Sequence, residues 1–309
     1  MSFYKYTTIS TAALVLKNKS LRWSSPVVFN DLEECQFTPF TNEQYIKAYN
    51  TYIDILTEYA KGNQLGYDVE RFSDVNMMII SLMQISLQEG SFTTEGFAEQ
   101  MLRFAQNSEG DFRDYINKAL INTFRILCVT EDADNNLMWA HYGDQHKGCV
   151  IELESVYSKR PRALREGKVR YHENLEPQTN PIDVLLYGET PEIRDIMIQD
   201  VIFSKRTNWN YEKEYRLMFA ESFGEIRTQI EVQTMKKEIT VNQSDKLFTD
   251  VAIEKEAVKS IVFGARTSVQ DIKDILAILE ESKYDCKTYQ MTMKDGKMVK
   301  EELDLSLIV

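Results

Sequence analysis

The stretch Asn208-Trp209-Asn210-Tyr211-Glu212-Lys213-Glu214-Tyr215-Arg216-Leu217-Met218-Phe219 alternates between apolar and charged residues. Side chains of a β-strand point alternately to its two faces, so residues two apart share a face. Trp209, Tyr211, Tyr215, Leu217 and Phe219 then lie on one face, and Glu212, Glu214 and Arg216 lie on the other. The pattern predicts a single strand over this stretch. Its apolar face would join a core, and its charged face would be either a solvated surface or the wall of a site.

Working outward from this stretch, the hydrophobic periodicity changes twice. From about residue 42 to 124, proline is absent and apolar residues recur in steps of three and four, which predicts a block of about four helices. On either side, short runs such as Phe124–Thr130, Cys149–Leu153 and Val258–Gly264 have strand character. The predicted fold is therefore α+β, a mostly antiparallel sheet with a helical insertion at 42–124, in a single domain over residues 1–309.

Several shorter elements are also predicted. Strands are expected at 3–9, 21–26, 169–171, 286–293 and 298–303, with a hairpin at Asp295-Gly296. Helices are expected at 10–19, starting at Ser10 or Thr11, at 191–203, and at 269–282, starting at Ser268. A short helix through Met138, Trp139 and Tyr142 would begin at Asp134, Asn135 or Asn136.

The composition excludes several classes of function. The formal net charge of −12 argues against broad, sequence-independent coating of nucleic acid, which needs a basic surface. The four cysteines (Cys35, Cys128, Cys149 and Cys286) form no Cys-x-x-Cys pair, so no structural zinc site is expected. The N-terminus lacks a signal-peptide core, and no apolar run approaches the roughly 20 residues that cross a bilayer. We therefore expect a cytoplasmic protein with no membrane contact.

Two groups of residues have the chemistry of a site. Glu212 and Glu214 can divide labour, with one carboxylate orienting an acceptor and the other stabilising positive charge on a sugar ring. His141 can contact a substrate or act as an acid or base, or it can simply bridge structural elements. His141 and His146 are five residues apart, which is not the spacing that places two metal ligands on one helix face.

A basic cluster is conspicuous in so acidic a chain. It consists of Lys159, Arg160, Arg162, Arg165, Lys168 and Arg170, and Lys205-Arg206 could extend it. Such a cluster can receive RNA or phosphate, or it can be a solvated loop that balances nearby acids. The sequence contains no GxGxxG, Walker or GxSxG motif.

Together, several short motifs resemble the bacterial DUF2971 family. They are Tyr4-Lys5-Tyr6, Leu21 to Pro26 followed by Phe29-Asn30-Asp31, Met138 to Tyr142 with Lys147-Gly148, Lys205 to Trp209, Tyr211 to Arg216, and Phe263-Gly264. The chain departs from the family at Asp31-Leu32-Glu33-Glu34, where the family often has Pro-Phe-Glu after Asn-Asp.

The order of elements and the late Glu212-Lys213-Glu214 triplet also resemble ADP-ribosyltransferases. This resemblance implies that Glu214 is catalytic and that Glu212 orients the acceptor. It implies NAD as the bound nucleotide, with Lys5 or Tyr6 on its adenosine or phosphate side, Ser24 lining the nicotinamide pocket and Tyr142 stacking on the ring. His141 is a further candidate catalytic residue, Asn30 and Arg216 are further candidates for cofactor binding, and no metal ligand is expected. The chain departs from those enzymes in having no arginine on the first strand and no Ser-Thr-Ser triplet.

Three functions stay open at this point. The first is an NAD-using ADP-ribosyltransferase or NAD glycohydrolase, such as a toxin or phage-defence effector, with RNA or protein as an acceptor bound through Lys159–Arg170. The second is a non-catalytic module that binds RNA or phosphate through the basic cluster with Lys205, Arg206 and Trp209. The third is a metal-dependent nuclease or hydrolase that uses Glu33, Glu212 and Glu214 as oxygen ligands.

Overall fold

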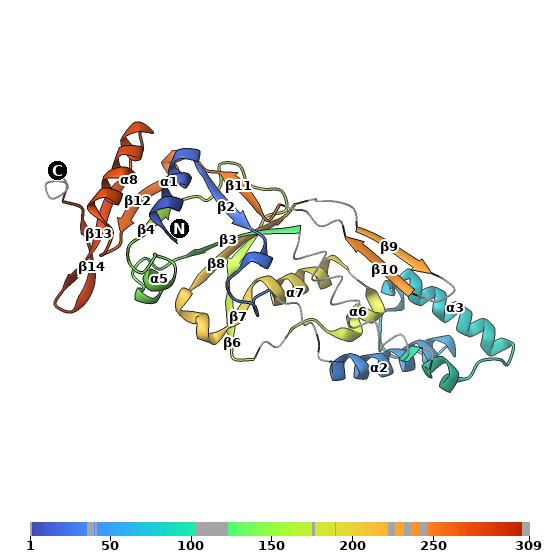
Figure 1. Ribbon diagram of the computed structural model, residues 1–309. Helices are drawn as coiled ribbons and strands as arrows, with labels where there is room; N and C mark the ends of the chain where they lie inside the picture. The colour runs from blue at the N-terminus through green and yellow to red at the C-terminus, as the bar shows by residue number, and fades with distance from the viewer. Residues whose placement is uncertain are drawn as a thin grey trace.

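The computed structural model describes residues 2–35, 40, 42–99, 101–102, 123–174, 177–188, 190–221, 226–231, 236–241 and 246–304. It confirms the predicted α+β fold with a mostly antiparallel sheet (Figure 1). The helices are α1 Ile9–Asn18, α2 Asn42–Ala60, α3 Asp74–Gln88, α5 Asn136–His141, α6 Pro181–Tyr187, α7 Pro191–Ile202 and α8 Val269–Glu281. Short 3-10 helices are η1 Pro26–Val28, η2 Val69–Arg71, η4 Thr207–Glu212 and η5 Lys255–Ala257.

The main sheet contains most of the strands. They are β1 Phe3–Thr7, β2 Ser20–Ser24, β3 Phe124–Thr130, β4 Cys149–Leu153, β5 Arg165–Lys168, β8 Glu214–Ala220, β11 Phe248–Ala252, β12 Val258–Phe263, β13 Lys287–Lys294 and β14 Lys297–Glu302. Their order is β11-β2-β3-β1-β4-β12-β13-β14, with β8 joining β3 to β5. The β12–β13 pair is parallel, and the other pairs of described strands in this sheet are antiparallel.

Strand β3 pairs with three other strands, β1, β2 and β8, and this arrangement creates room for a site. Strand β8 pairs with β3 along the whole length of β3, from Phe124 to Thr130. Strands β1 and β2 must therefore share the other edge of β3. Tyr4 of β1 pairs with Thr130, and Ser24 of β2 pairs with Ile126. Between these two contacts β1 and β2 diverge, which leaves the middle of that β3 edge without a strand partner.

Two helices cover the sheet and bury its main core. Helices α1 and α8 contribute Leu16 and Ile275, which pack with Trp23, Ile151 and Leu217 from the strands. The side chain of Thr8 accepts a hydrogen bond from the backbone N–H of Thr11, so Thr8 begins α1 rather than the predicted Ser10 or Thr11. Ser268 begins α8 as predicted.

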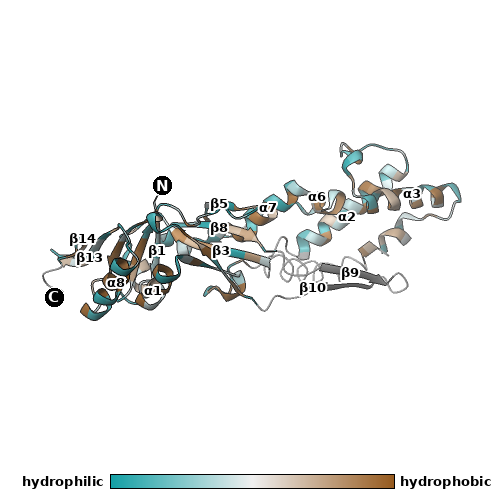
Figure 2. Cartoon of the chain, turned by 90° about the horizontal axis from the view of Figure 1, so that it is seen from above, coloured by the Kyte–Doolittle hydropathy of each residue, from teal (hydrophilic) through white to brown (hydrophobic). Residues whose placement is uncertain are grey.

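The helical block forms a second core at one end of an elongated molecule, opposite β13 and β14 (Figure 2). Helices α2, α3 and α6 meet around the buried amide of Asn76. The hydroxyl of Tyr52 donates to Oδ1 of Asn76, and Nδ2 of Asn76 donates to the carbonyl oxygens of Leu185 and Leu186 at 2.7 and 2.8 Å. A buried amide needs such partners, so this contact fixes how the three helices meet.

The opening stretch does not form the single predicted strand. Residues Thr207–Glu212 are the 3-10 helix η4, and β8 begins only at Glu214. Lys213 between them has a left-handed backbone, with φ of 43°. The alternation of apolar and charged residues therefore corresponds to a strand only from Glu214 onward.

Several other elements were not predicted, namely α6, β5, β7 (Ser204–Arg206), β9 (Ile226–Glu231), β10 (Lys236–Val241) and β11. Strand β6 (Arg170–His172), which pairs in parallel with β7, corresponds to the strand predicted at 169–171. The helices predicted over 104–120 lie outside the described residues. No described helix is long and apolar enough to cross a bilayer.

Candidate functional site

A cavity of about 460 Å³ opens beside the middle of β3, where β1 and β2 diverge. This volume falls in the range of small-molecule sites. The strands contribute Tyr4, Lys5, Tyr6, Arg22, Ser24, Ile126, Leu127, Cys128, Val129, Thr130, Lys205 and Glu214 to the lining. Val28 belongs to η1, and Phe29, Asn30 and Glu34 follow it, while Met138, His141, Tyr142 and Glu212 belong to α5, the turn after it and η4.

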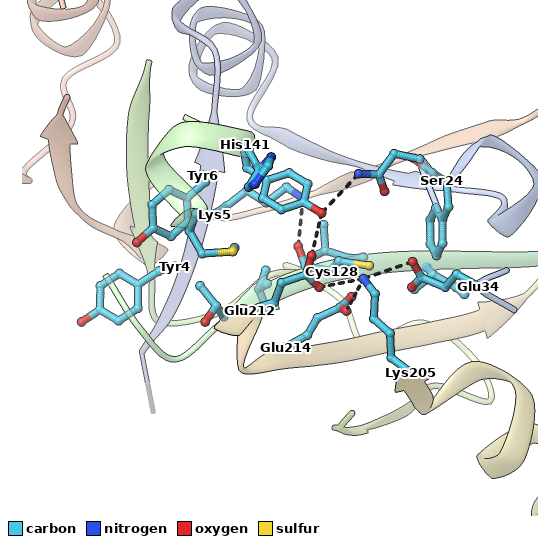
Figure 3. Close-up of a pocket in the computed structure, with 18 of the residues that line it drawn as sticks. Tyr4, Lys5, Tyr6, Ser24, Glu34, Cys128, His141, Lys205, Glu212 and Glu214 are labelled. Carbon is cyan, nitrogen blue, oxygen red and sulfur yellow. Dashed lines mark hydrogen bonds and ion pairs between the residues drawn. The ribbon is translucent and has the colours of Figure 1, made fainter. Parts of the chain in front are cut away.

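The cavity gathers nearly all of the predicted site residues. Lys5, Tyr6, Ser24, Asn30, His141, Tyr142, Glu212 and Glu214 all border it. Arg216, the remaining one, does not line the cavity. Its guanidinium is fully buried and donates two hydrogen bonds to the carboxylate of Glu214. Figure 3 shows Glu34, Lys205, Glu212 and Glu214 gathered at the cavity.

Glu212 and Glu214 reach the cavity from two different elements. Glu212 ends η4 and Glu214 begins β8, with the left-handed residue Lys213 between them. Glu212 is 3% exposed and Glu214 is 6% exposed. The alternative in which these carboxylates form a solvated surface is therefore wrong.

Five buried charges form one connected group beside the cavity, which we call the charged network: Glu34, Glu212, Glu214, Lys205 and Arg216. The ammonium of Lys205 lies 2.7 Å from Oε2 of Glu212, 3.1 Å from Oε2 of Glu34 and 3.6 Å from Oε2 of Glu214. Arg216 binds Glu214 with two parallel hydrogen bonds of 2.8 and 2.9 Å and also pairs with Glu34. Buried charges persist only with such partners.

Burial and the neighbouring charges shift the titration of this network. Burial raises the pKa of Glu214 to about 7; the charge of Lys205 opposes the rise and that of Glu212 adds to it. Burial alone would lower the pKa of Lys205, but the carboxylates of Glu214 and Glu212 outweigh it and raise that pKa. Burial lowers the pKa of Arg216 to about 9, which still leaves the guanidinium charged at neutral pH.

Tyr142 holds the Glu212 carboxylate at the edge of the cavity, and Asn30 holds Tyr142. The hydroxyl of Tyr142 donates to Oε1 of Glu212 at 2.6 Å, and the side-chain amide of Asn30 donates to that hydroxyl at 3.3 Å. Burial and the hydrogen bond to Glu212 raise the pKa of Tyr142. Both carboxylate oxygens of Glu212 therefore have fixed donors, Tyr142 on one side and Lys205 on the other.

Helix α5 and the turn after it place His141 and Tyr142 at the cavity. Contacts of Asn135 and Gly148 hold the chain before and after this helix. The side chain of Asn135 accepts hydrogen bonds from the first backbone N–H groups of α5, and its amide donates to the carbonyl oxygen of Tyr211 in η4 at 2.6 Å. At the other end, Gly148 lies so close to β1 that an added Cβ would be 2.2 Å from the carbonyl oxygen of Thr7. His141 is exposed, with its ring centroid 6.0 Å from that of Tyr211.

Residues of β1 and β2 also line the cavity. The ammonium of Lys5 donates to the carbonyl oxygen of Cys128 at 2.8 Å, on the part of β3 that lacks a strand partner. The hydroxyl of Tyr6 donates to the carbonyl oxygen of Asp132, so Tyr6 presents only its ring to a ligand. Ser24 borders the cavity at the point where β2 meets β3.

Comparison with known proteins covers the part of the chain that holds most of this site. Residues 138–217 match DUF2971, a family described as a protein of unknown function. The resemblance to DUF2971 is confirmed over this stretch. No curated protein and no solved structure matches the chain. The resemblance to ADP-ribosyltransferases stays a prediction.

The DUF2971 stretch contains His141 and Tyr142, which border the cavity. It also contains most of the charged network, namely Lys205, Glu212, Glu214 and Arg216. Glu34 lies outside it, and neither Glu34 nor Lys205 was among the predicted catalytic or cofactor-binding residues. Residue type gave no signal for Glu34, because only its contact with Lys205 and Arg216 distinguishes it from its neighbour Glu33.

The three carboxylates of the metal-dependent alternative, Glu33, Glu212 and Glu214, do not converge. The carboxylate of Glu33 is 63% exposed and pairs with Arg206 outside the cavity. Glu34 takes its place, but the ammonium of Lys205 lies where Glu34, Glu212 and Glu214 converge. Among the described residues no group of three or more histidine, cysteine or acidic side chains has the geometry to hold a metal ion.

Four residues of the basic cluster in the DUF2971 stretch are paired with acids. Arg160 pairs with Glu166, Arg165 with Asp195, Lys168 with Glu131 and Arg170 with Asp200, at 2.5 to 3.6 Å. These pairs favour the interpretation of a charge-balanced surface. Contact with RNA or a protein acceptor through Lys159–Arg170 stays a prediction.

Proposed function

We propose that this protein is an ADP-ribosyltransferase-like enzyme that binds NAD in the cavity and breaks the bond between nicotinamide and ribose. The observation that carries the proposal is the position of Glu212 and Glu214. Both carboxylates border one cavity, and both accept hydrogen bonds from fixed protein donors. Carboxylates fixed in advance stabilise positive charge that develops on a sugar ring as its bond to a leaving group breaks.

The proposed reaction balances with the groups present. The bonding electrons leave with nicotinamide, which departs as a neutral molecule, while the ribose carbon becomes positively charged next to Glu214. A hydroxyl group of the acceptor, or water, then attacks this carbon, and Glu212 takes its proton. Transfer to a macromolecule would give an ADP-ribosyltransferase, and transfer to water an NAD glycohydrolase. Either activity would suit a toxin or a phage-defence effector in the bacterial cytoplasm.

The lining combines groups of different character, which supports a dinucleotide. The glutamates would face the sugar on which positive charge develops. The ammonium of Lys5, which also borders the cavity, would suit the phosphates. Phe29 and Tyr142 add aromatic surface.

The test is release of nicotinamide from NAD, with cell extract supplied as a source of acceptors. We expect Glu214→Gln to lower the rate at least about 100-fold, because it removes the charge and keeps the shape. Glu33→Gln is the matched control, because that exposed carboxylate lies one residue from Glu34 but outside the cavity. If the wild-type protein releases no nicotinamide with any extract, the proposal is wrong.

A further inference from the structure

The charged network contains three carboxylates and two cations, so it has one negative charge in excess. All five groups are buried, with exposed fractions from 0 to 7%. An uncompensated buried charge is costly, so the network favours taking up one positive charge, either a proton or a cationic ligand.

In the part of the chain that the structure describes, no cation other than Lys205 and Arg216 pairs with the carboxylates of this network. The titratable and charged groups that face Glu214 are Cys128 of β3, Tyr171 of β6, Lys205 of β7, Glu212 of η4, and Glu34, with Arg216 on its own strand and Asp31 acting on Arg216. Two other cations border the cavity. Lys5 is held by the carbonyl oxygen of Cys128, and the exposed Arg22 pairs with Asp250.

The same cavity is rich in aromatic rings. Tyr4, Tyr6, Phe29, His141 and Tyr142 border it, and Trp209 lies against the ammonium of Lys205 at 4.7 Å. Aromatic faces attract cations and stack on flat rings, so they suit a ligand that is both planar and positively charged.

We propose that the Glu214 end of the cavity selects a positively charged aromatic ring of the N-alkylpyridinium class, and that binding of this ring releases a proton from the charged network. The inference rests on the proposed NAD-cleaving function and adds to it a basis for choosing oxidised over reduced nicotinamide. Because burial raises the pKa of Glu214 to about 7, the network is partly protonated at neutral pH. A cation close to the carboxylates favours their charged form, and the proton passes to the solvent.

The test is calorimetric titration of the full-length protein with 1-methylnicotinamide, in buffers of different ionisation enthalpy. The buffer dependence gives the number of protons released. Because burial raises the pKa of Glu214 to about 7, we expect release of a fraction of a proton per ligand, with a larger fraction at pH 6 than at pH 8. Neutral nicotinamide, which differs by one methyl group and one charge, should bind at least about tenfold more weakly and release no proton.

Two variants assign the proton. Glu214→Gln should abolish its release, and Glu34→Gln serves the same purpose if the first variant does not fold. Glu33→Gln, outside the cavity, should behave as the wild type. Equal affinity for the charged and neutral rings would overturn the inference, as would undiminished proton release in a folded Glu214→Gln protein.

The outcomes separate this inference from the proposed function. If 1-methylnicotinamide binds with proton release but NAD is never cleaved, the charge-selective site stands and the enzymatic proposal fails. If NAD is cleaved but the neutral ring binds equally well, the enzymatic proposal stands and charge selection fails.

Discussion

Lys205 is the residue on which the site depends most, because its ammonium contacts all three buried carboxylates. Without it, Arg216 would still pair with Glu34 and Glu214, but Glu212 would have no cationic partner among the described residues and would keep only the hydrogen bond from Tyr142. A buried carboxylate that loses its ionic partner destabilises the folded state, because nothing then compensates for its lost hydration.

We therefore expect Lys205→Met to lower the free energy of unfolding by about 3–5 kcal/mol, which is typical of breaking a buried ion pair. Lys213→Met is the matched control. Lys213 also pairs with an acid, Asp132, at 2.9 Å, but its side chain is 63% exposed, so a loss of no more than about 1 kcal/mol is expected. Urea denaturation measures both, and equal losses would contradict the central place of Lys205.

The pH dependence of stability should report Glu214 directly. Its pKa is about 7 in the folded protein and near the ordinary 4.5 in the unfolded chain, so between these values the folded state binds more protons. The stability contributed by protonation of Glu214 is fully present below pH 4.5 and is lost as the pH rises through 7. Relative to Glu214→Gln, the wild type should lose up to about 3 kcal/mol across this window. Parallel curves of unfolding free energy against pH for the two proteins would contradict the assignment.

At the scale of elements, the position of α5 depends on the close contact between Gly148 and β1. The loop before Gly148 contains three successive left-handed residues, Asp144, Gln145 and His146. Backbone hydrogen bonds from Gly148 to Gly143 and from Arg266 to His146 hold this loop. Tyr142, which orients Glu212, lies at its start.

Gly148→Ala should therefore destabilise the protein by more than about 2 kcal/mol, because the added Cβ would meet the backbone of Thr7 at 2.2 Å. It should also weaken binding of 1-methylnicotinamide through displacement of Tyr142. Gly167→Ala, in β5, is the control, since its Cβ would meet only the ring of Phe203 at an ordinary 3.8 Å. Thermal melting and titration of both variants check the prediction, which fails if they behave alike.

Strong periodicity and capping residues predicted many elements correctly from sequence. Strands β3, β4 and β12, helix α8 and the β13–β14 hairpin fall where alternation, Ser268 and Asp295-Gly296 placed them. Short elements such as β7 and β11 were missed, since a few residues give too little pattern. The stretch 208–219 was misread because nothing in the residue types marks Lys213 as left-handed.

The same reasoning explains which site residues could be predicted. Residues within the recognisable motifs, such as Lys5, Asn30, Tyr142 and Glu214, lie together at one cavity. Glu34 and the role of Lys205 were missed, because a buried charge is distinguished from an exposed one only by partners from distant parts of the chain.

At the scale of the whole molecule, the cavity and the helical block rely on separate cores. The cavity residues belong to the sheet, its edges and α5, while α2, α3 and α6 pack around Tyr52, Leu56 and Asn76. None of the described residues that line the cavity belongs to α2 or α3.

Asn76→Ala should consequently loosen the block without changing the site. It removes three hydrogen bonds of a buried amide, so we expect a loss of about 2–3 kcal/mol. Faster hydrogen exchange in α2 and α3, with unchanged affinity for 1-methylnicotinamide, is the expected result. A loss of affinity that accompanies the loosening would show that the block supports the cavity after all.

The left-handed turn at Lys213 also changes how related proteins should be recognised. A sequence search with the glutamate–any residue–glutamate triplet alone would also find ordinary charged strands. The geometry here adds a lysine seven residues before the first glutamate and an arginine two residues after the second, as in Lys205, Glu212, Glu214 and Arg216. A chain with the triplet but without this lysine would lack the group that makes burial of the carboxylates tolerable, so the four-residue signature is the one to follow across genomes.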